Sequence, residues 1–365
     1  MRRRTFITTA VLVAVAGCRS VSPSHGSPLA DSTAELQGRL DALKPGDTLV
    51  LEPRIYAHSG VLTVRVPGVR IDGNGATLQA TNDETSALQV AADGVQLANL
   101  TLTAPTEGKR WNGLDQHKLV LRGNQATLDH VTIIGSAAAG VFVSGVDGFR
   151  IDSVNIRGTR ADGIHMTAGS RNGQVVNVTA DQTGDDAVAV VSYSADSELC
   201  RDINISQVHV ASTRWGRGIT VVGGSKIAIR DFDVANTNSA GIYIASEGQP
   251  YFTESVADVT VAAGRVTRAN TNPDIIQGAV LVYAGNAGKY VRNVAISELD
   301  IVDTTPSAER NVAIVLGGGR VEGISLNRIH VSQSSLPLLT SDAPAGDYTT
   351  SDWTLDGSPV AVVNG

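Results

Sequence analysis

The chain has 365 residues, of which 42% are hydrophobic and 18% charged, so it can fold around a sizeable core. Its 38 glycines, 4% aromatic residues and two cysteines exclude a collagen, a disulfide-stabilised scaffold and a helical bundle. The formal net charge of −7 makes nucleic acid an unfavourable partner.

The first 18 residues have the features of an export signal. Three arginines precede an apolar run that is too short to span a bilayer, and residues 15–18 resemble a bacterial lipobox. We expect 1–18 to be the export signal, Cys18 to carry a lipid that anchors the chain to the membrane, and 19–30 to be a flexible tether. The protein is then a bacterial cell-envelope lipoprotein or, if the segment is an ordinary signal peptide, a secreted protein.

A short helix is predicted at the start of the folded domain, which we place at 31–365. The segment Ser32-Thr33-Ala34-Glu35 has the pattern of a capping box, and three leucines follow it at helical spacing. Pro45-Gly46 ends the helix. We expect this helix to cover the N-terminal edge of the strands that follow, which would otherwise be open to aggregation.

Two short patterns recur beyond the helix. The first has apolar residues at i, i+3 and i+5, and it begins at Leu97, Leu128, Ile151, Val175, Ile205, Ile229, Val261, Ile296 and Leu326. The second is a small residue followed by apolar-x-apolar, and it begins at Gly140, Gly163, Ala187, Gly218, Gly241 and Ala279. The intervals between these six positions are 23, 24, 31, 23 and 38 residues, which is typical of stacked coils. The sequence therefore predicts an all-β fold, a single-stranded right-handed parallel β-helix of about nine or ten turns.

Acids and arginines recur at one corner of three successive coils. Asp162, Asp186 and Arg217 each stand two residues before the first apolar residue of a second-pattern strand, so they have the same phase. Carboxylates in phase on adjacent coils should lie roughly 5–10 Å apart, which suits paired acid and base work at a glycosidic bond. The loops that carry them are Thr159-Arg160-Ala161-Asp162, Thr183-Gly184-Asp185-Asp186 and Thr213-Arg214-Trp215-Gly216-Arg217.

The face beside these loops is predicted to bind the substrate. Side chains alternate along a strand, so an outward ladder is expected from Phe142, His165, Ala189, Thr220, Tyr243 and Leu281. An aromatic ring can stack on a sugar while guanidinium groups pair with its oxygens. The insertions 192–201 and 247–255 are expected to wall the face. The candidate substrate-binding residues are Arg160, His165, Tyr193, Arg214, Trp215, Arg217 and Tyr243.

The motifs resemble those of polygalacturonase-type glycoside hydrolases, in the pectate-lyase-like superfamily of right-handed parallel β-helices. Ala161-Asp162-Gly163-Ile164, the run 184–190 and Gly216-Arg217-Gly218-Ile219 are similar, in order, to the Asn-Thr-Asp-Gly, Asp-Asp-Cys-Ile-Ala-Ile and Gly-His-Gly signatures of that family. The resemblance implies inverting hydrolysis of a polysaccharide without a cofactor. Asp185 would be the general acid, and Asp162 and Asp186 would orient the attacking water.

Two departures from the family pattern keep other functions open. Arg160 stands where the family has asparagine, and Arg217 stands where it has histidine. Related β-helix lyases use an arginine as base beside aspartates that hold Ca²⁺, so a Ca²⁺-dependent polysaccharide lyase is one alternative. A glycan-binding surface protein without catalysis is another, because this fold also serves as a scaffold and Gly-Asp-Asp is ordinary turn chemistry. We expect a monomer in each case.

Overall fold

The computed structural model describes residues 29–362. The expected export signal, Cys18 and most of the expected tether lie outside the described residues. The chain from Asp31 onward forms one compact unit. In the described part of the chain, no helix is long and apolar enough to cross a membrane.

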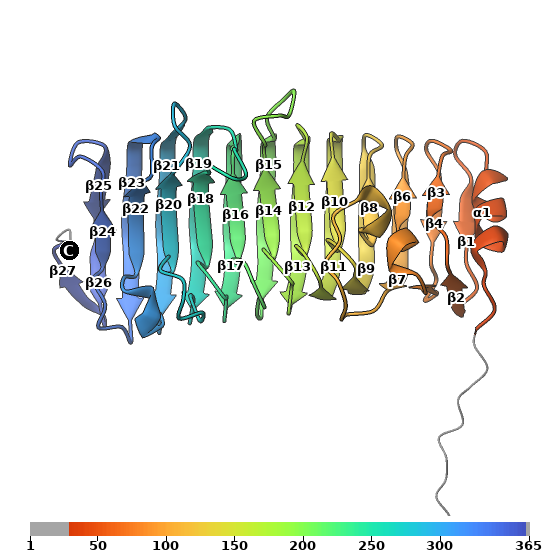
Figure 1. Ribbon diagram of the computed structural model, residues 1–365, viewed down its shortest axis with the longest axis horizontal. Coiled ribbons are helices and arrows are strands. Elements are labelled where there is room, and N and C mark those ends of the chain that lie inside the picture. Colours follow the sequence, from red (N-terminus) through yellow and green to blue (C-terminus); the bar gives the residue numbers. More distant parts are fainter. Residues whose placement is uncertain (1–28, 363–365) are drawn as a thin grey trace, which may run out of the picture. The chain divides into compact units, whose positions relative to one another are not determined.

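Within residues 29–362, two sheets of 16 and 11 strands run along the stack of coils (Figure 1). The first sheet comprises β1 (Thr48–Val50), β4 (Arg70–Asp72), β7 (Gln96–Thr103), β9 (Ala126–Ser136), β11 (Asp147–Thr159), β13 (Arg171–Asp181), β15 (Arg201–Val210), β17 (Gly224–Ala235), β19 (Val256–Thr267), β21 (Tyr290–Val302), β23 (Arg320–Ser332), β26 (Trp353–Leu355) and β27 (Ser358–Val360), with β2 (Ile55–His58), β5 (Thr77–Ala80) and β25 (Tyr348–Ser351) beside this path. The second sheet comprises β3 (Leu62–Val64), β6 (Leu88–Val90), β8 (Leu119–Leu121), β10 (Val141–Ser144), β12 (Ile164–Thr167), β14 (Val188–Val191), β16 (Ile219–Val222), β18 (Ile242–Ser246), β20 (Val280–Ala284), β22 (Val312–Leu316) and β24 (Leu339–Ser341).

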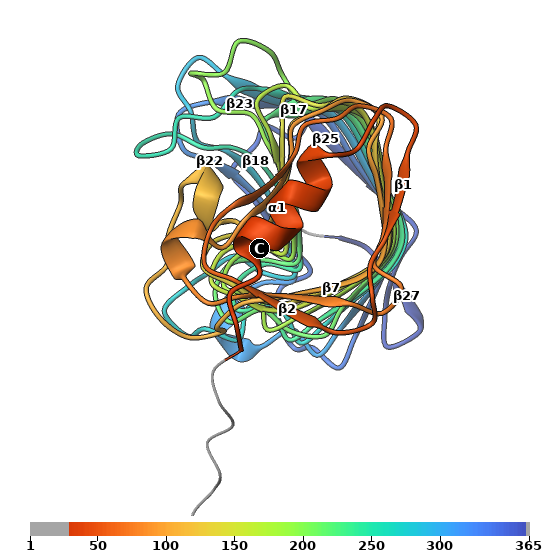
Figure 2. The same ribbon diagram turned by 90° about the vertical axis from the view of Figure 1, so that its right-hand side faces the viewer.

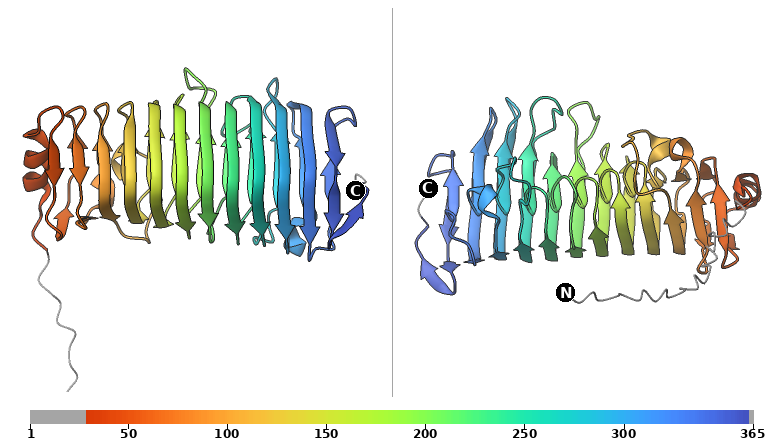
Figure 3. Two further views of the ribbon diagram at one scale, coloured as in Figure 1. Left: turned by 180° about the vertical axis from the view of Figure 1, so that it is seen from behind. Right: turned by 60° about the horizontal axis from the view of Figure 1, so that its bottom comes forward.

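Successive coils pair in parallel, and their strands run side by side in every view (Figure 3). The predicted parallel β-helix is therefore confirmed. The predicted number of about nine or ten turns was too low, because the second sheet has 11 strands among the described residues. Most turns that the pattern missed lack the small residue that opens it, for example those with Val61 before β3 and Lys118 before β8, but the turn of β6 keeps the pattern as Ala87-Leu88-Gln89-Val90 and was overlooked.

One residue in each long strand of the first sheet explains the spacing of the first pattern. Side chains alternate along a strand, so apolar residues at i and i+3 would point to opposite faces of a regular strand. The residue before the second apolar position has a left-handed backbone, which bends the strand and turns both apolar side chains into the core. These residues have φ between +52° and +55°, and they are Asn99, His130, Ser153, Asn177, Gln207, Asp231, Ala263, Glu298 and Arg328.

The predicted helix is α1 (Thr33–Asp41), which covers the N-terminal end of the stack (Figure 2) and buries Leu36 and Leu40. Its start differs from the prediction, because Ser32 makes no capping hydrogen bond with its side chain. Asp31 replaces it: its Oδ1 accepts the Thr33 N–H at 2.8 Å. In the described part of the chain, three short 3₁₀ helices occupy loops, at η1 (Asp83–Thr85), η2 (Leu114–Gln116) and η3 (Pro306–Ala308).

Candidate active site

The three acids stand on turns that successive coils repeat. A threonine opens each turn and its Oγ1 donates back to a carbonyl of the same turn. These hydrogen bonds run from Thr159 to Ala161 O (2.7 Å), from Thr183 to Asp185 O (2.8 Å), from Thr213 to Gly216 O (3.3 Å) and from Thr237 to Ser239 O (2.8 Å). The turns at Thr159, Thr183 and Thr237 therefore share one hydrogen-bond pattern, whereas the turn at Thr213 is one residue longer and its threonine bonds a carbonyl three residues on.

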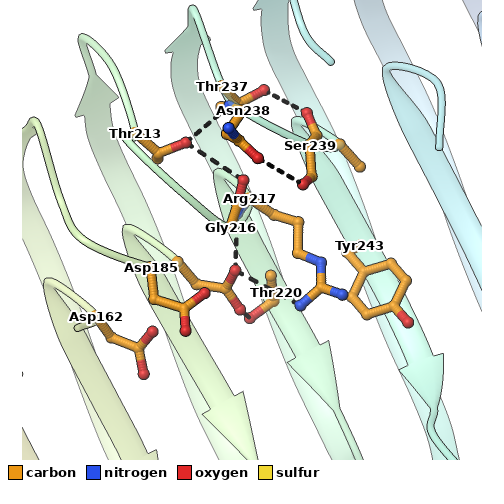
Figure 4. Close-up of polar contacts among 12 residues, drawn as sticks. Asp162, Asp185, Thr213, Gly216, Arg217, Thr220, Thr237, Asn238, Ser239 and Tyr243 are labelled. Atoms are coloured by element: carbon orange, nitrogen blue, oxygen red, sulfur yellow. Dashed lines mark hydrogen bonds and ion pairs between the residues drawn. The ribbon is translucent and has the colours of Figure 1, made fainter. Parts of the chain in front are cut away.

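The register at this corner brings the predicted aspartates together. Ile164, Val188 and Ile219 are neighbours in the second sheet, so the acids before the first two strands are in phase with Arg217 before the third. One carboxylate oxygen from each of Asp162, Asp185 and Asp186 lies within 4.8 Å of the other two. We call these three residues the aspartate cluster. Figure 4 shows Asp162 beside Asp185, with Arg217 and Thr220 on the coil that follows Asp185.

Asp186 is the most enclosed member of the cluster. Its Oδ1 accepts the backbone N–H of Arg217 at 2.7 Å, and its Oδ2 accepts the hydroxyl of Thr220 at 3.0 Å. Burial raises the pKa of Asp186 to about 7; the charge of Arg217 opposes the shift, and the two other carboxylates add to it. Asp186 is thus fixed in orientation, with both oxygens already engaged.

Asp185 is the member nearest to solvent, with 27% of its side chain exposed. Its Oδ2 lies 2.7 Å from Nη1 of Arg110. Burial and the neighbouring charge of Asp162 raise the pKa of Asp185 in spite of Arg110. A Cβ at Gly216, where φ is +68°, would come within 2.4 Å of Asp185 Oδ1, so glycine is needed for the turn to pass this carboxylate.

Asp162 is paired with the outward ladder. Its Oδ2 lies 2.5 Å from Nδ1 of His165. The predicted ladder is present in the strand register, where Phe142 neighbours His165 and the series continues through Ala189, Thr220, Tyr243 and Leu281.

Arg217 is enclosed by acids and by an aromatic ring. Its Nη2 lies 3.3 Å from Glu247 Oε1, its Nη1 lies 3.8 Å from Asp186, and its guanidinium stands 4.1 Å above the Tyr243 ring. Burial favours the neutral form, but the charges of Asp186, Tyr243 and Glu247 outweigh it and raise the pKa of Arg217 above its usual value. Arg217 is therefore unsuited to act as a base.

Two neighbouring hollows share Arg110 as a lining residue, and we call them together the cleft. The smaller, of about 270 Å³, contains the three aspartates together with Tyr193, Glu247 and Tyr251 from the two long insertions. The other, of about 380 Å³, is lined by Arg214 and Trp215. A larger hollow of about 690 Å³ lies over the first sheet, but none of the three residues of the aspartate cluster lines it.

Six of the seven predicted substrate-binding residues line this cleft, namely Arg160, His165, Tyr193, Arg214, Trp215 and Arg217. The indole of Trp215 is 71% exposed. Arg214 donates to Thr159 O at 2.6 Å and pairs with Glu107 at 3.1 Å, so it is partly engaged.

Arg160, although it lines the cleft, and Tyr243, which does not, both have their polar groups engaged within the protein. Arg160 is buried, and its terminal nitrogens are bound to Asp83, Lys109 O and Pro105 O, so it holds the loop after β7 in place. Tyr243 is only 2% exposed, because the Arg217 guanidinium covers its ring. Neither can offer its polar end to a sugar in this arrangement.

Four residues of the site were not predicted from the sequence. Thr220 was expected in the ladder but not as a partner of Asp186. Glu247 and Tyr251 belong to an insertion that was expected to wall the face, without a named role. Arg110 comes from the loop between β7 and β8, and no repeat pattern relates that loop to the acids.

One oxygen from each aspartate of the cluster is close enough to the other two to share a metal ion, but most oxygens of the cluster already have other partners. Ca²⁺ takes six to eight oxygen ligands as a rule. Here Asp162 Oδ2 faces His165, Asp185 Oδ2 faces Arg110, and both oxygens of Asp186 accept hydrogen bonds. Two guanidinium groups also lie beside the cluster, where a cation would be repelled.

Comparison with known proteins supports the same fold. A family described as the right handed beta helix region matches residues 117–296. No protein of curated function matches the chain. The catalytic domain of a GH87 α-1,3-glucanase in complex with nigerose superposes with a TM-score of 0.71 at 16% identity, covering 92% of this chain and 65% of that one. This chain thus spans less than two thirds of that catalytic domain.

Two further solved structures are similar. The catalytic unit of a thermostable GH87 α-1,3-glucanase from Streptomyces thermodiastaticus strain HF3-3 has a TM-score of 0.60 at 18% identity, covering 91% of this chain and 68% of that one. The family 28 exopolygalacturonase of Yersinia enterocolitica has a TM-score of 0.56 at 12% identity, covering 91% of this chain and 76% of that one.

The spacing of the acids has a parallel among the glucanase structures. They include single alanine variants of three aspartates, of which two are adjacent and the third stands 23 positions earlier. Asp162, Asp185 and Asp186 have the same spacing. At these identities the comparisons show the fold, and they confirm that the chain has the right-handed parallel β-helix fold expected from its resemblance to the pectate-lyase-like superfamily.

Proposed function

We propose that the protein is a glycoside hydrolase acting on a polysaccharide or oligosaccharide. The observation that carries the proposal is the aspartate cluster, whose carboxylate oxygens lie within 4.8 Å of one another at the bottom of a cleft. Glucanases and an exopolygalacturonase of the same fold support it, since one of these structures holds nigerose. The predicted signal and Cys18 would place this activity at the cell envelope or outside the cell.

Asp185 is the proposed general acid. Burial and the charge of Asp162 raise its pKa, which favours the protonated form that an acid needs, and it is the most exposed carboxyl of the cluster. It gives its proton to the glycosidic oxygen as the bond to the anomeric carbon breaks. Arg110 stands beside it and would be displaced or would turn to the substrate when the sugar enters.

Asp162 and Asp186 are proposed to hold the attacking water. A water that makes two hydrogen bonds of about 2.8 Å can bridge oxygens up to roughly 5.6 Å apart, so the spacing of 4.8 Å accommodates one. The water gives one proton to a carboxylate, and its oxygen forms the new bond to the anomeric carbon. Direct attack by water inverts the configuration of that carbon.

The stereochemistry needs its own test. Inverting enzymes usually separate the two carboxyl groups by about 6.5–9.5 Å and retaining enzymes by about 5–5.5 Å. The oxygens of the cluster, which lie within 4.8 Å of one another, are closer together than either range and nearer to that of retaining enzymes. Proton NMR of the first product formed distinguishes the two outcomes: the proposal expects inverted configuration, and retention would make one aspartate a nucleophile.

Exposed rings at both sides of the acids suit a sugar chain. Trp215 is 71% exposed in one hollow and Tyr251 is 62% exposed in the other. Because Arg110 and Asp185 lie where the hollows meet, a chain crossing this point would have sugar rings on both sides of the acid.

The test is digestion of a glycan panel that includes α-1,3-glucan and polygalacturonate, with and without EDTA. New reducing ends that EDTA does not suppress, without ultraviolet absorbance from an unsaturated product, are expected. Absorbance that EDTA abolishes would indicate the lyase, and glycan binding without turnover would indicate a binding protein. Asp185→Asn serves as the inactive control in every digestion.

A further inference from the structure

His165 was predicted to contact the substrate, but its position points to a different role. It is the second residue of β12 and its side chain is 10% exposed, about as little as the 11% of Asp162. Its Nδ1 lies 2.5 Å from Asp162 Oδ2. An ionised carboxylate only accepts hydrogen bonds, so Nδ1 is the donor of this pair.

A row of stacked rings fixes the plane of His165. Phe142 lies 5.2 Å from it with an interplanar angle of 9°, and Tyr193 lies 6.5 Å from it at 22°. His117 extends the row, 4.1 Å from Phe142, and its Nδ1 accepts the N–H of Ala139 at 3.0 Å. The imidazole is held between neighbours, so its Nδ1–H stays directed at Asp162.

The hydrogen bonds of the cluster distinguish Asp162 from Asp186. Both oxygens of Asp186 accept hydrogen bonds, from Arg217 and Thr220. In Asp162 only Oδ2 is engaged, and no hydrogen bond to its Oδ1 is found among the residues described. Asp162 lines the same hollow as Asp185, so its second oxygen is the one available to a water there.

We propose that His165 is a positioning residue that orients Asp162 as the base, an inference that rests on the proposed hydrolase function. Asp162 Oδ1 takes the proton from the attacking water, and the water oxygen bonds to the anomeric carbon. His165 keeps its Nδ1 proton throughout and holds Oδ2. Asp186 acts as the fixed second acceptor that aligns the water.

Two variants separate this role from a packing role. His165→Asn places an amide N–H where Nδ1 stands but removes the stacked ring, and His165→Phe keeps a ring but removes the donor. We expect kcat to fall roughly 10- to 100-fold in His165→Phe and about threefold or less in His165→Asn, with similar KM values.

The opposite order of the two variants would show that His165 serves only to pack the ladder. A rise in KM with unchanged kcat in both would show that it contacts the substrate. Either result overturns the inference while leaving the hydrolase function intact.

A measurement without substrate covers the case in which the wild type cleaves no glycan. Proton NMR of the ¹⁵N-labelled protein should show a downfield Nδ1 proton of His165 that disappears in Asp162→Ala, while circular dichroism confirms that the variant is folded. No glycan cleavage by the wild type would refute the proposed function alone. Absence of the downfield proton, or its persistence in Asp162→Ala, would refute the orientation of Asp162 by His165.

Discussion

Two buried polar clusters lie at the same corner of the β-helix, one in the aspartates and one around a lysine. Lys118 stands directly before β8, in the position that Gly140 and Gly163 occupy before the next strands. Its side chain is completely buried, with Nζ 3.0 Å from Ser86 O and 3.1 Å from His58 Nε2. We call Lys118, His58 and Ser86 the lysine cluster.

The clusters differ in their counter-charges and in their access to solvent. Arg110 and Arg217 lie within 4 Å of aspartate oxygens, and the aspartate cluster opens into the cleft. Among the described residues, Lys118 has no ion pair, and burial lowers its pKa to about 7. His58 is a neutral partner, because burial and the charge of Lys118 lower its pKa to about 4. In this protein a buried ionisable group therefore indicates a catalytic role only where a cleft reaches it. No cleft reaches the lysine cluster, so we assign it a structural role.

The largest effect on activity is expected in the aspartate cluster, from Asp185→Asn. Asparagine keeps the shape but cannot give a proton to the glycosidic oxygen, so kcat should fall about 10²- to 10⁴-fold. Binding of a non-cleaved oligosaccharide, measured by calorimetry, should change little. Asp274→Asn, at an exposed aspartate outside the cleft, is the matched control. Unchanged kcat in Asp185→Asn would show that Asp185 is not the general acid.

Asp186→Asn tests the charge in the aspartate cluster through stability. The pKa of Asp186 is about 7 when folded and 3.8 in the reference state, so between these values the folded chain keeps a proton that the unfolded chain loses. The contribution of Asp186 to the free energy of unfolding therefore decreases as pH rises from about 4 to 7. The free energy of unfolding of Asp186→Asn, relative to that of the wild type, should rise by on the order of 2–4 kcal/mol between pH 4 and 7. Urea unfolding at each pH measures it. A difference that does not vary with pH would contradict the burial argument.

Lys118→Met is expected to show the opposite pH dependence. Between pH 7 and 10.5 the unfolded lysine holds a proton that the folded one lacks, so wild-type stability falls as pH decreases through this window. Methionine also leaves His58 and Ser86 without a donor, which costs about 1–3 kcal/mol at every pH. The variant should therefore be clearly less stable than wild type near pH 10 and approach or exceed it near pH 7. Lys44→Met, at an exposed lysine, should show no such trend.

The contrast also separates what the sequence could predict from what it could not. The apolar spacing predicted the coils because every turn repeats the same bend, and the acids were found because turns of equal phase stack. Arg110 was missed because its loop has no periodicity, and its place over Asp185 depends on Arg160, which ties that loop to the stack. Lys118 was missed because a lysine in place of a small residue gives no sign in the sequence that it is buried.

The smallest effect is expected at the rim of the cleft, from Trp215→Ala. The indole is 71% exposed and packs little against the protein, so the free energy of unfolding should change by less than about 0.5 kcal/mol. Loss of a stacking surface for a sugar ring should raise KM about 3- to 10-fold with little change in kcat, since the ring lies beside the acids and not among them. Steady-state kinetics on the oligosaccharide that the panel identifies provides the measurement. An equal fall in kcat would mean that this ring helps to place the scissile bond, and the chemistry would then extend beyond the aspartate cluster.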